Sequence, residues 1–225
     1  MRAMIFDTET TGLPRTNVIN EETLHKWPHI VQFSYVVYDI EEQQIIQTSD
    51  FIINVSDEVI ITEENSKIHG ITNELCRLKG VRIETALVKF LEDASICCMF
   101  IGHNIQFDLN MIRVELMRMV AKKPNYYLEY LNFMDKLENC KRLYCTMQET
   151  VDLCNIVKND KNGKPYVKFP KLEELHEKLF QTVPLNLHNS LNDVLITLKC
   201  FIKLKYDINI EDQLTNRLNT NIKSN

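Results

Sequence analysis

The chain has 225 residues and a mass of 26.5 kDa, which fits one medium domain or one domain with an extended tail. Its 44% apolar and 25% charged residues are ordinary for a soluble globular protein, so neither metal nor disulfides are needed to hold the core. A formal net charge of −5 argues against a protein that coats nucleic acid indiscriminately. Basic residues still gather at Lys122-Lys123, at Lys141-Arg142 and from Lys158 to Lys171, where they form either a solvated face or a surface that meets phosphates.

The cysteine pattern and the lengths of the apolar runs indicate in which cellular compartment the protein is expected. Seven cysteines are an odd number and none forms a CxxC pair, so we expect reduced thiols. The first apolar stretch stops at Asp7, which is unlike a secretory leader, and the run Ile96–Ile101 is too short to cross a bilayer. We therefore expect an intracellular, soluble protein, cytoplasmic or nuclear, with no membrane contact.

The first half of the chain reads as strands followed by a helix. A short apolar run reaches Asp7 and Glu9 and predicts a strand buried on both faces, whose end emerges at a site. Ile30–Ile40 and Ile45–Val55 predict a hairpin. Residues 57–80 are predicted to be loop and short helix, before an amphipathic helix over Ile83–Ala94.

In the second half, strands and helices alternate. A second buried strand is expected at Ile96–Gly102, followed by a helix over 105–121. Residues 122–142 contain Pro124 and several aromatics and are read as an insertion of uncertain form. The remaining expectations are a short strand at Leu143–Met147, a helix at 148–156, a loop at Lys158–Lys168, and helices from Pro170 to Phe180 and over 190–205. We predict an α/β domain over residues 1–205, with a mixed sheet flanked by helices, and a polar tail over 206–225.

Acidic residues lie at the ends of three predicted elements. Asp7 and Glu9 are two apart on a strand and leave the same face, although acids are also common where a strand meets solvent. Asp108 is in the first turn of its helix, where an interaction with the helix dipole is the alternative explanation. Asp193 follows Ser190 as in a capping box, but it also lies on the helix face expected to pack on the sheet.

These carboxylates are costly beside apolar segments unless something compensates their charge. Magnesium or manganese ions are the natural compensation, because hard oxygen ligands suit them. His188, five residues before Asp193, is placed to exchange a proton at neutral pH. The sequence therefore predicts a metal-dependent phosphodiesterase.

Five segments resemble the DEDDh group of DnaQ-like 3′–5′ exonucleases, in order along roughly residues 2–205. FDTETTGL, HNIQFD and HNSLNDV resemble the three motifs of the group, and the last carries its histidine variant; the stretches IHGIT and FPKLEELHEKLF agree as well. The resemblance implies a ribonuclease H-like fold with a five-stranded mixed sheet. It also implies two divalent cations, Mg²⁺ or Mn²⁺.

The same resemblance implies a role for each residue of the motifs. Asp7, Glu9 and Asp193 would hold the cation that activates water, Asp7 would bridge to the second cation, and Asp108 would assist it through water. His188 would be the general base. Substrate contacts would come from five further residues, of which two offer polar groups and three wall the terminal nucleotide: Thr8, Thr10, Leu13, His69 and Phe107. For Phe107, a place in the core is an equal alternative.

The leading hypothesis is an exonuclease that releases nucleoside 5′-monophosphates from single-stranded 3′ ends. The first motif resembles proofreading-type enzymes, so DNA is favoured over RNA, and a separate DNA polymerase is a possible partner. An RNA-trimming exoribonuclease is the alternative. A non-catalytic interaction subunit of a polymerase is a third hypothesis, but a scaffold has no reason to keep all five residues of the motifs.

Overall fold

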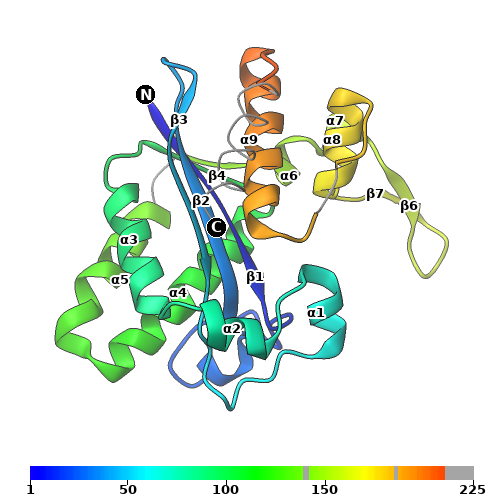
Figure 1. Cartoon of the computed structure of the whole chain (residues 1–225). Coiled ribbons are helices and arrows are strands. Elements are labelled where there is room, and N and C mark those ends of the chain that lie inside the picture. The colour runs from blue at the N-terminus through cyan, green and yellow to red at the C-terminus, as the bar shows by residue number, and fades with distance from the viewer. Residues whose placement is uncertain (139–141, 185–186, 211–225) are drawn as a thin grey trace.

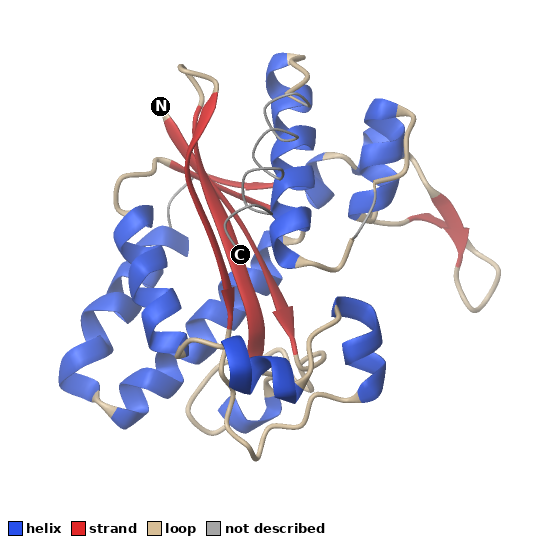
Figure 2. Cartoon of the chain, viewed as in Figure 1, coloured by secondary structure: helices blue, strands red, loops and turns tan. Residues whose placement is uncertain are grey.

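The structure is a computed structural model that describes residues 1–138, 142–184 and 187–210. Five strands form one mixed sheet in the order β3-β2-β1-β4-β5 (Figures 1 and 2). They are β1 (Arg2–Thr10), β2 (Ile30–Asp39), β3 (Gln44–Ile52), β4 (Met99–Gly102) and β5 (Leu143–Cys145). The first three pair antiparallel, whereas β4 runs parallel to β1 and to β5. This confirms the predicted α/β fold with a five-stranded mixed sheet.

Helices cover both faces of this sheet (Figure 2). α3 (Ile83–Ala94), α4 (Ile105–Lys122) and α5 (Pro124–Glu138) lie on one side, and the long helix α9 (Ser190–Tyr206) lies on the other (Figure 1). The shorter elements are η1 (Leu24–Lys26), α1 (Glu63–His69), α2 (Asn73–Lys79), α6 (Thr146–Glu149), α7 (Val151–Cys154) and α8 (Leu172–Phe180).

Strand β1 separates two apolar cores, because alternate side chains of a strand point to opposite faces. Met4 and Phe6 join the core against α3, α4 and α5, whereas Ala3 and Ile5 join the core against α9. By the same alternation, the odd-numbered Asp7 and Glu9 leave the face that α9 covers. The strand thus aims its acids at the beginning of α9.

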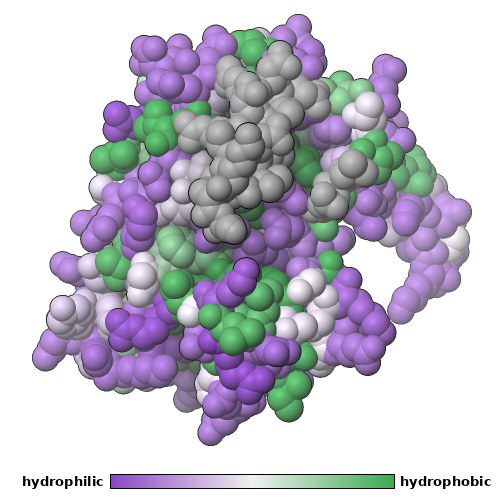
Figure 3. Space-filling model, in the orientation of Figure 1, coloured by the Kyte–Doolittle hydropathy of each residue, from purple (hydrophilic) through white to green (hydrophobic). Residues whose placement is uncertain are grey.

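Two segments differ from the sequence-based expectations. Residues 124–138, part of the stretch read as an insertion of uncertain form, are the helix α5, which begins at Pro124 because the first helical position needs no amide hydrogen. Residues 158–168, expected to be a loop, contain a hairpin of β6 (Val157–Asn159) and β7 (Pro165–Val167). Its strands show no apolar periodicity because both are exposed on either face. The hairpin projects from the domain as a mainly hydrophilic arm (Figure 3).

Other boundaries moved by a few residues. The second buried strand begins at Met99 rather than Ile96, and the helix expected at 148–156 is divided into α6 and α7. Most of the predicted tail, residues 211–225, lies outside the described residues, so the domain boundary stays a prediction. Within the described part of the chain, every helix is too short or too polar to span a membrane.

Candidate active site

Four carboxylates from three elements converge beyond the buried part of β1, and we call Asp7, Glu9, Asp108 and Asp193 the acidic cluster. Asp7 and Glu9 come from β1, Asp108 from the first turn of α4, and Asp193 from the first turn of α9. Asp108, Asp193 and Glu9 all lie near enough to Asp7 to repel its charge. The chain folds this way because the parallel strands β1 and β4 end at the same edge of the sheet.

Asp108 is fixed to β1 by two hydrogen bonds. Its Oδ1 accepts the backbone N–H of Thr8 at 2.9 Å and the Thr8 hydroxyl at 2.7 Å. Both residues are buried. Thr8 was expected to offer a polar group to the nucleotide, but its amide and its hydroxyl both donate to Asp108. Thr8 therefore holds Asp108 in position.

Asp193 and His188 are joined through the start of α9. The N-cap of this helix is Asn189, whose side chain accepts the Asn192 amide, so Ser190 and Asp193 do not form the capping box considered from the sequence. Asp193 instead accepts the His188 amide with Oδ2 at 3.2 Å, and its buried Oδ1 has no hydrogen-bond partner among the described residues. His188 is exposed, and its backbone is left-handed, with φ at 65°.

Burial and mutual repulsion make the ionised cluster unfavourable without a cation. Burial, and then the charges of Asp193 and Asp108, raise the pKa of Glu9 to about 8. Burial raises the pKa of Asp108 to about 7 against the two Thr8 hydrogen bonds, and that of Asp193 to about 7 against the His188 amide. Burial, followed by Asp108, also raises the pKa of Asp7 well above its ordinary value.

The residues present fit a divalent cation. Glu9, His188 and Asp193 each offer one ligand atom, and these three atoms lie within 4.8 Å of one another. The partnerless Oδ1 of Asp193 is a further acceptor that a cation would satisfy. Carboxylate oxygens suit Mg²⁺ and Mn²⁺, and a positive charge here would reverse the pKa shifts of the cluster.

A buried polar network, which the sequence analysis missed, holds α9 against β1. The Gln32 amide group donates to Asp50 Oδ1 at 2.8 Å and accepts the Ser190 backbone N–H at 3.2 Å. The Ser190 hydroxyl donates to the Asp7 carbonyl at 2.6 Å. Gln32 and Ser34 are two polar residues, two apart, inside the apolar run of β2, and both bond to Asp50. These two polar residues inside an otherwise apolar strand were the sequence feature that could have indicated the network.

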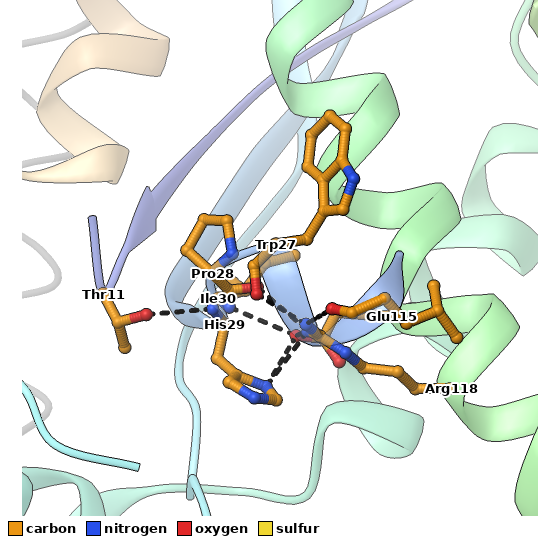
Figure 4. Close-up of polar contacts among 8 residues, drawn as sticks. Thr11, Trp27, Pro28, His29, Ile30, Glu115 and Arg118 are labelled. Carbon is orange, nitrogen blue, oxygen red and sulfur yellow. Dashed lines mark hydrogen bonds and ion pairs between the residues drawn. The ribbon is translucent and has the colours of Figure 1, made fainter. Parts of the chain in front are cut away.

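A second network, also missed, holds the connection between β1 and β2 (Figure 4). Arg118 of α4 donates to the carbonyls of Leu24, Trp27 and Pro28 at 2.7–2.9 Å, and to Glu115 Oε1 at 2.7 Å. Burial alone would raise the pKa of Glu115, but His29 and Arg118 hold it below its usual range. The connection begins at Thr11 and ends at His29, and the Thr11 hydroxyl accepts the His29 amide at 3.0 Å.

The other expected substrate residues lie in different settings. Leu13, 82% exposed, and Thr10, which donates its hydroxyl to the Gly12 carbonyl, both follow the acids of β1. His69 is buried at the end of α1, its Nε2 has no hydrogen-bond partner among the described residues, and the charge of His188 acts on it. Burial lowers the pKa of His69. Phe107 is half-buried against the core beneath α4, which supports the core alternative.

Comparisons with known proteins agree with this architecture. The RNase T family of exonucleases matches residues 4–139, more than half of the chain. The DNA polymerase III subunit epsilon of Buchnera aphidicola is 24% identical over 232 residues, covering 100% of this chain and 90% of that protein.

Solved structures of exonuclease I share the fold. The E. coli enzyme in complex with a dT13 oligonucleotide has a TM-score of 0.64 at 17% identity, over 92% of this chain and 42% of that chain. Exonuclease I from Methylocaldum szegediense has a TM-score of 0.58 at 17% identity, over 92% and 41%. The chain thus spans about two fifths of the length of these exonucleases. The chain belongs to the RNase T exonuclease family and is a DnaQ-like 3′–5′ exonuclease.

Proposed function

We propose that this exonuclease is cation-dependent and removes nucleoside 5′-monophosphates one at a time from the 3′ ends of single-stranded DNA. The observation that carries the proposal is the convergence of four carboxylates, with raised pKa values, beside an exposed histidine. Four ionised carboxylates repel one another when no cation is bound, and divalent cations would remove that repulsion. The same cations could then contact the oxygens of a phosphodiester.

Two cations are assigned to the cluster. Asp7, Glu9 and Asp193 would hold one, while Asp7 would also hold the second, with Asp108 assisting through water. When bound, a pair of divalent cations stabilises the attacking and the leaving oxygen of a phosphodiester and orients both. The protein fixes the ligands beforehand, since Thr8 locks Asp108 and the Ser190 hydroxyl ties α9 to β1.

His188 is assigned the role of general base. It lies beside Glu9 and Asp193, it is open to solvent, and Asp193 accepts its backbone amide. The imidazole would take the proton of the attacking water as the water oxygen bonds to phosphorus and the bond to the 3′ oxygen breaks. A neighbouring carboxylate would stabilise the imidazolium that results.

The substrate class and the partner rest on the relatives. The E. coli exonuclease I structure contains a thymidine oligonucleotide, and the Buchnera relative is a polymerase subunit. These support single-stranded DNA as the substrate and a separate DNA polymerase as a partner. Thr10, Leu13 and His69 remain our candidates for contacts to the terminal nucleotide, and Phe107 is the weakest candidate.

The test is digestion of 5′-labelled single-stranded DNA, mismatched duplex, matched duplex and RNA of equal length, with Mg²⁺ or Mn²⁺. We expect a ladder that shortens from the 3′ end, a mononucleotide product with a 5′-phosphate, and the fastest digestion for single-stranded and mismatched DNA. Faster digestion of RNA would make the chain an exoribonuclease. Absence of digestion in both metals, by protein that is folded, would refute the proposal.

A further inference from the structure

The β6–β7 hairpin contributes nothing to the cores of the protein. All residues from Val157 to Val167 are exposed, including Tyr166 at 48% and Val157 at 58%. An isolated two-stranded hairpin is marginally stable in water, so a projecting one needs support from its base, its turn or a partner.

Its base and its turn are both fixed by specific bonds. At the base, Lys168 Nζ donates to Glu174 Oε1 of α8 at 2.7 Å, and the Lys168 amide extends the ladder to the Ile156 carbonyl. At the turn, Asp160 Oδ1 accepts the amides of Asn162 and Lys164 at 2.8 and 2.9 Å. The structure thus holds an exposed arm in a defined shape and direction.

The two faces of the arm differ in chemistry. Lys158 pairs directly with Tyr166, so their side chains share one face, while Val157 pairs with Val167 on the other. Lys161 and Lys164 add two exposed ammonium groups at the turn. The one carboxylate of this stretch, Asp160, is engaged by the turn amides. The arm therefore presents three lysines and an aromatic ring on a chain whose net charge is −5.

We propose that this arm binds the phosphate backbone and a base of the single-stranded nucleic acid, upstream of the 3′ end that the acidic cluster cleaves. Lysines that follow the backbone, with an aromatic ring on which a base stacks, are what proteins use to bind single strands without sequence preference. The hairpin lies on the α9 side of the sheet, beside α7 and α8, and α8 leads into the segment that carries His188 (Figure 1). The inference rests on the proposed function, because the nucleic-acid strand runs past the hairpin only if its 3′ end is cleaved at the acidic cluster.

The test compares a long substrate with one too small to reach the arm. The long substrate is oligothymidylate of about 30 nucleotides, beyond the roughly 4–16 nucleotides that one single-strand-binding fold covers. The small one is the p-nitrophenyl ester of thymidine 5′-monophosphate. The variant replaces Lys158, Lys161 and Lys164 by Ala, and the control removes three exposed positive charges elsewhere, by Lys79→Ala, Lys122→Ala and Lys123→Ala.

We expect the hairpin variant to raise KM for the long substrate by about tenfold or more at low salt, and to leave kcat/KM for the small ester unchanged. The slope of log KM against log salt concentration should fall by about 2, because each lost contact with a single strand removes about 0.7. Tyr166→Ala should raise the same KM by about fivefold or more, and Tyr166→Phe should not. The control variant should leave KM nearly unchanged, and both lysine variants should melt like the wild type.

Two results would overturn the proposal: an unchanged KM in the hairpin variant, or an equal rise in the control variant. If the wild type cleaves neither substrate, the proposed function fails, and fluorescence anisotropy of the labelled oligothymidylate still tests the arm. Weaker binding by the hairpin variant than by the control would then support the arm, and equal binding would refute it.

Discussion

Adding a divalent cation to the cation-free protein should raise its melting temperature, and the rise should be larger at about pH 8 than at about pH 5.5. In the folded, cation-free chain the pKa values of Asp108 and Asp193 are about 7, against an ordinary 3.8, and that of Glu9 is about 8, against 4.5. The folded state therefore keeps protons that the unfolded state releases. Folding stability must fall as pH rises from about 4 to about 8, and it is regained as pH falls.

The size of this effect can be worked from one residue. For Asp193, a pKa raised from 3.8 to about 7 costs on the order of 4 kcal/mol of folding free energy at pH values above both. A cation at 100 times its Kd adds about 2.7 kcal/mol to stability. For a chain of this length that corresponds to a rise in melting temperature of about 5–11 °C.

The assay is thermal unfolding followed by circular dichroism, in EDTA or in Mn²⁺, across this pH range. Asp108→Asn keeps an acceptor for Thr8 but removes a buried charge, so it should raise the melting temperature in EDTA and shrink the increment from Mn²⁺. The matched control is Asp57→Asn at an exposed acid, which should change neither quantity. A melting temperature in EDTA that does not depend on pH, together with no increment from Mn²⁺, would refute the reasoning.

Three further predictions concern His188, Gln32 and Arg118. His188→Ala should lower kcat by ~10²–10⁴-fold while the melting increment from Mn²⁺ persists, as expected for a lost general base; loss of the increment as well would make the imidazole a ligand. Gln32→Leu should lower kcat by roughly 10–100-fold with little change in KM, because it frees the start of α9. Gln32→Glu combined with Asp50→Asn exchanges the donor and the acceptor of this hydrogen bond and should restore most of the rate. If the double variant stays as slow as Gln32→Leu, Gln32 does not act by positioning α9. Arg118→Met should destabilise the fold by about 3–5 kcal/mol in chemical denaturation, since it removes the guanidinium partner of the buried Glu115 carboxylate and the donor of three backbone carbonyls; a loss below about 1 kcal/mol would contradict a structural role for the network in Figure 4.

Much of the fold could be predicted because its central strands are apolar and end in polar residues. The run before Asp7 and the run before His103 are buried on both faces, so their length and termination are visible in the sequence. The motif order along the chain then indicated the acids that converge. Long-range hydrogen bonds leave no such periodic signal. Gln32 and Ser190 are 158 positions apart, and nothing local to either indicates the other.

Two segments could not be assigned correctly from the sequence, for different physical reasons. Pro124 and the aromatics left the form of residues 122–142 undecided, but a proline at the first helical position fits a helix, and α5 packs against α3 and α4. The β6–β7 hairpin has short strands with no buried face, so the alternation that reveals a strand is missing. What stabilises that hairpin is the Asp160 turn and the Lys168–Glu174 ion pair, which only the three-dimensional structure reveals.

One measurement tests most directly whether the acidic cluster hydrolyses the 3′ ends of nucleic acid through bound cations. It is turnover of 5′-labelled single-stranded DNA by the wild type and by Asp7→Asn, each in EDTA and in Mg²⁺. Stepwise shortening by the wild type in Mg²⁺ alone, with at least about 100-fold less turnover by Asp7→Asn, is the expected result. Equal turnover by the two proteins, or turnover that continues in EDTA, would contradict it.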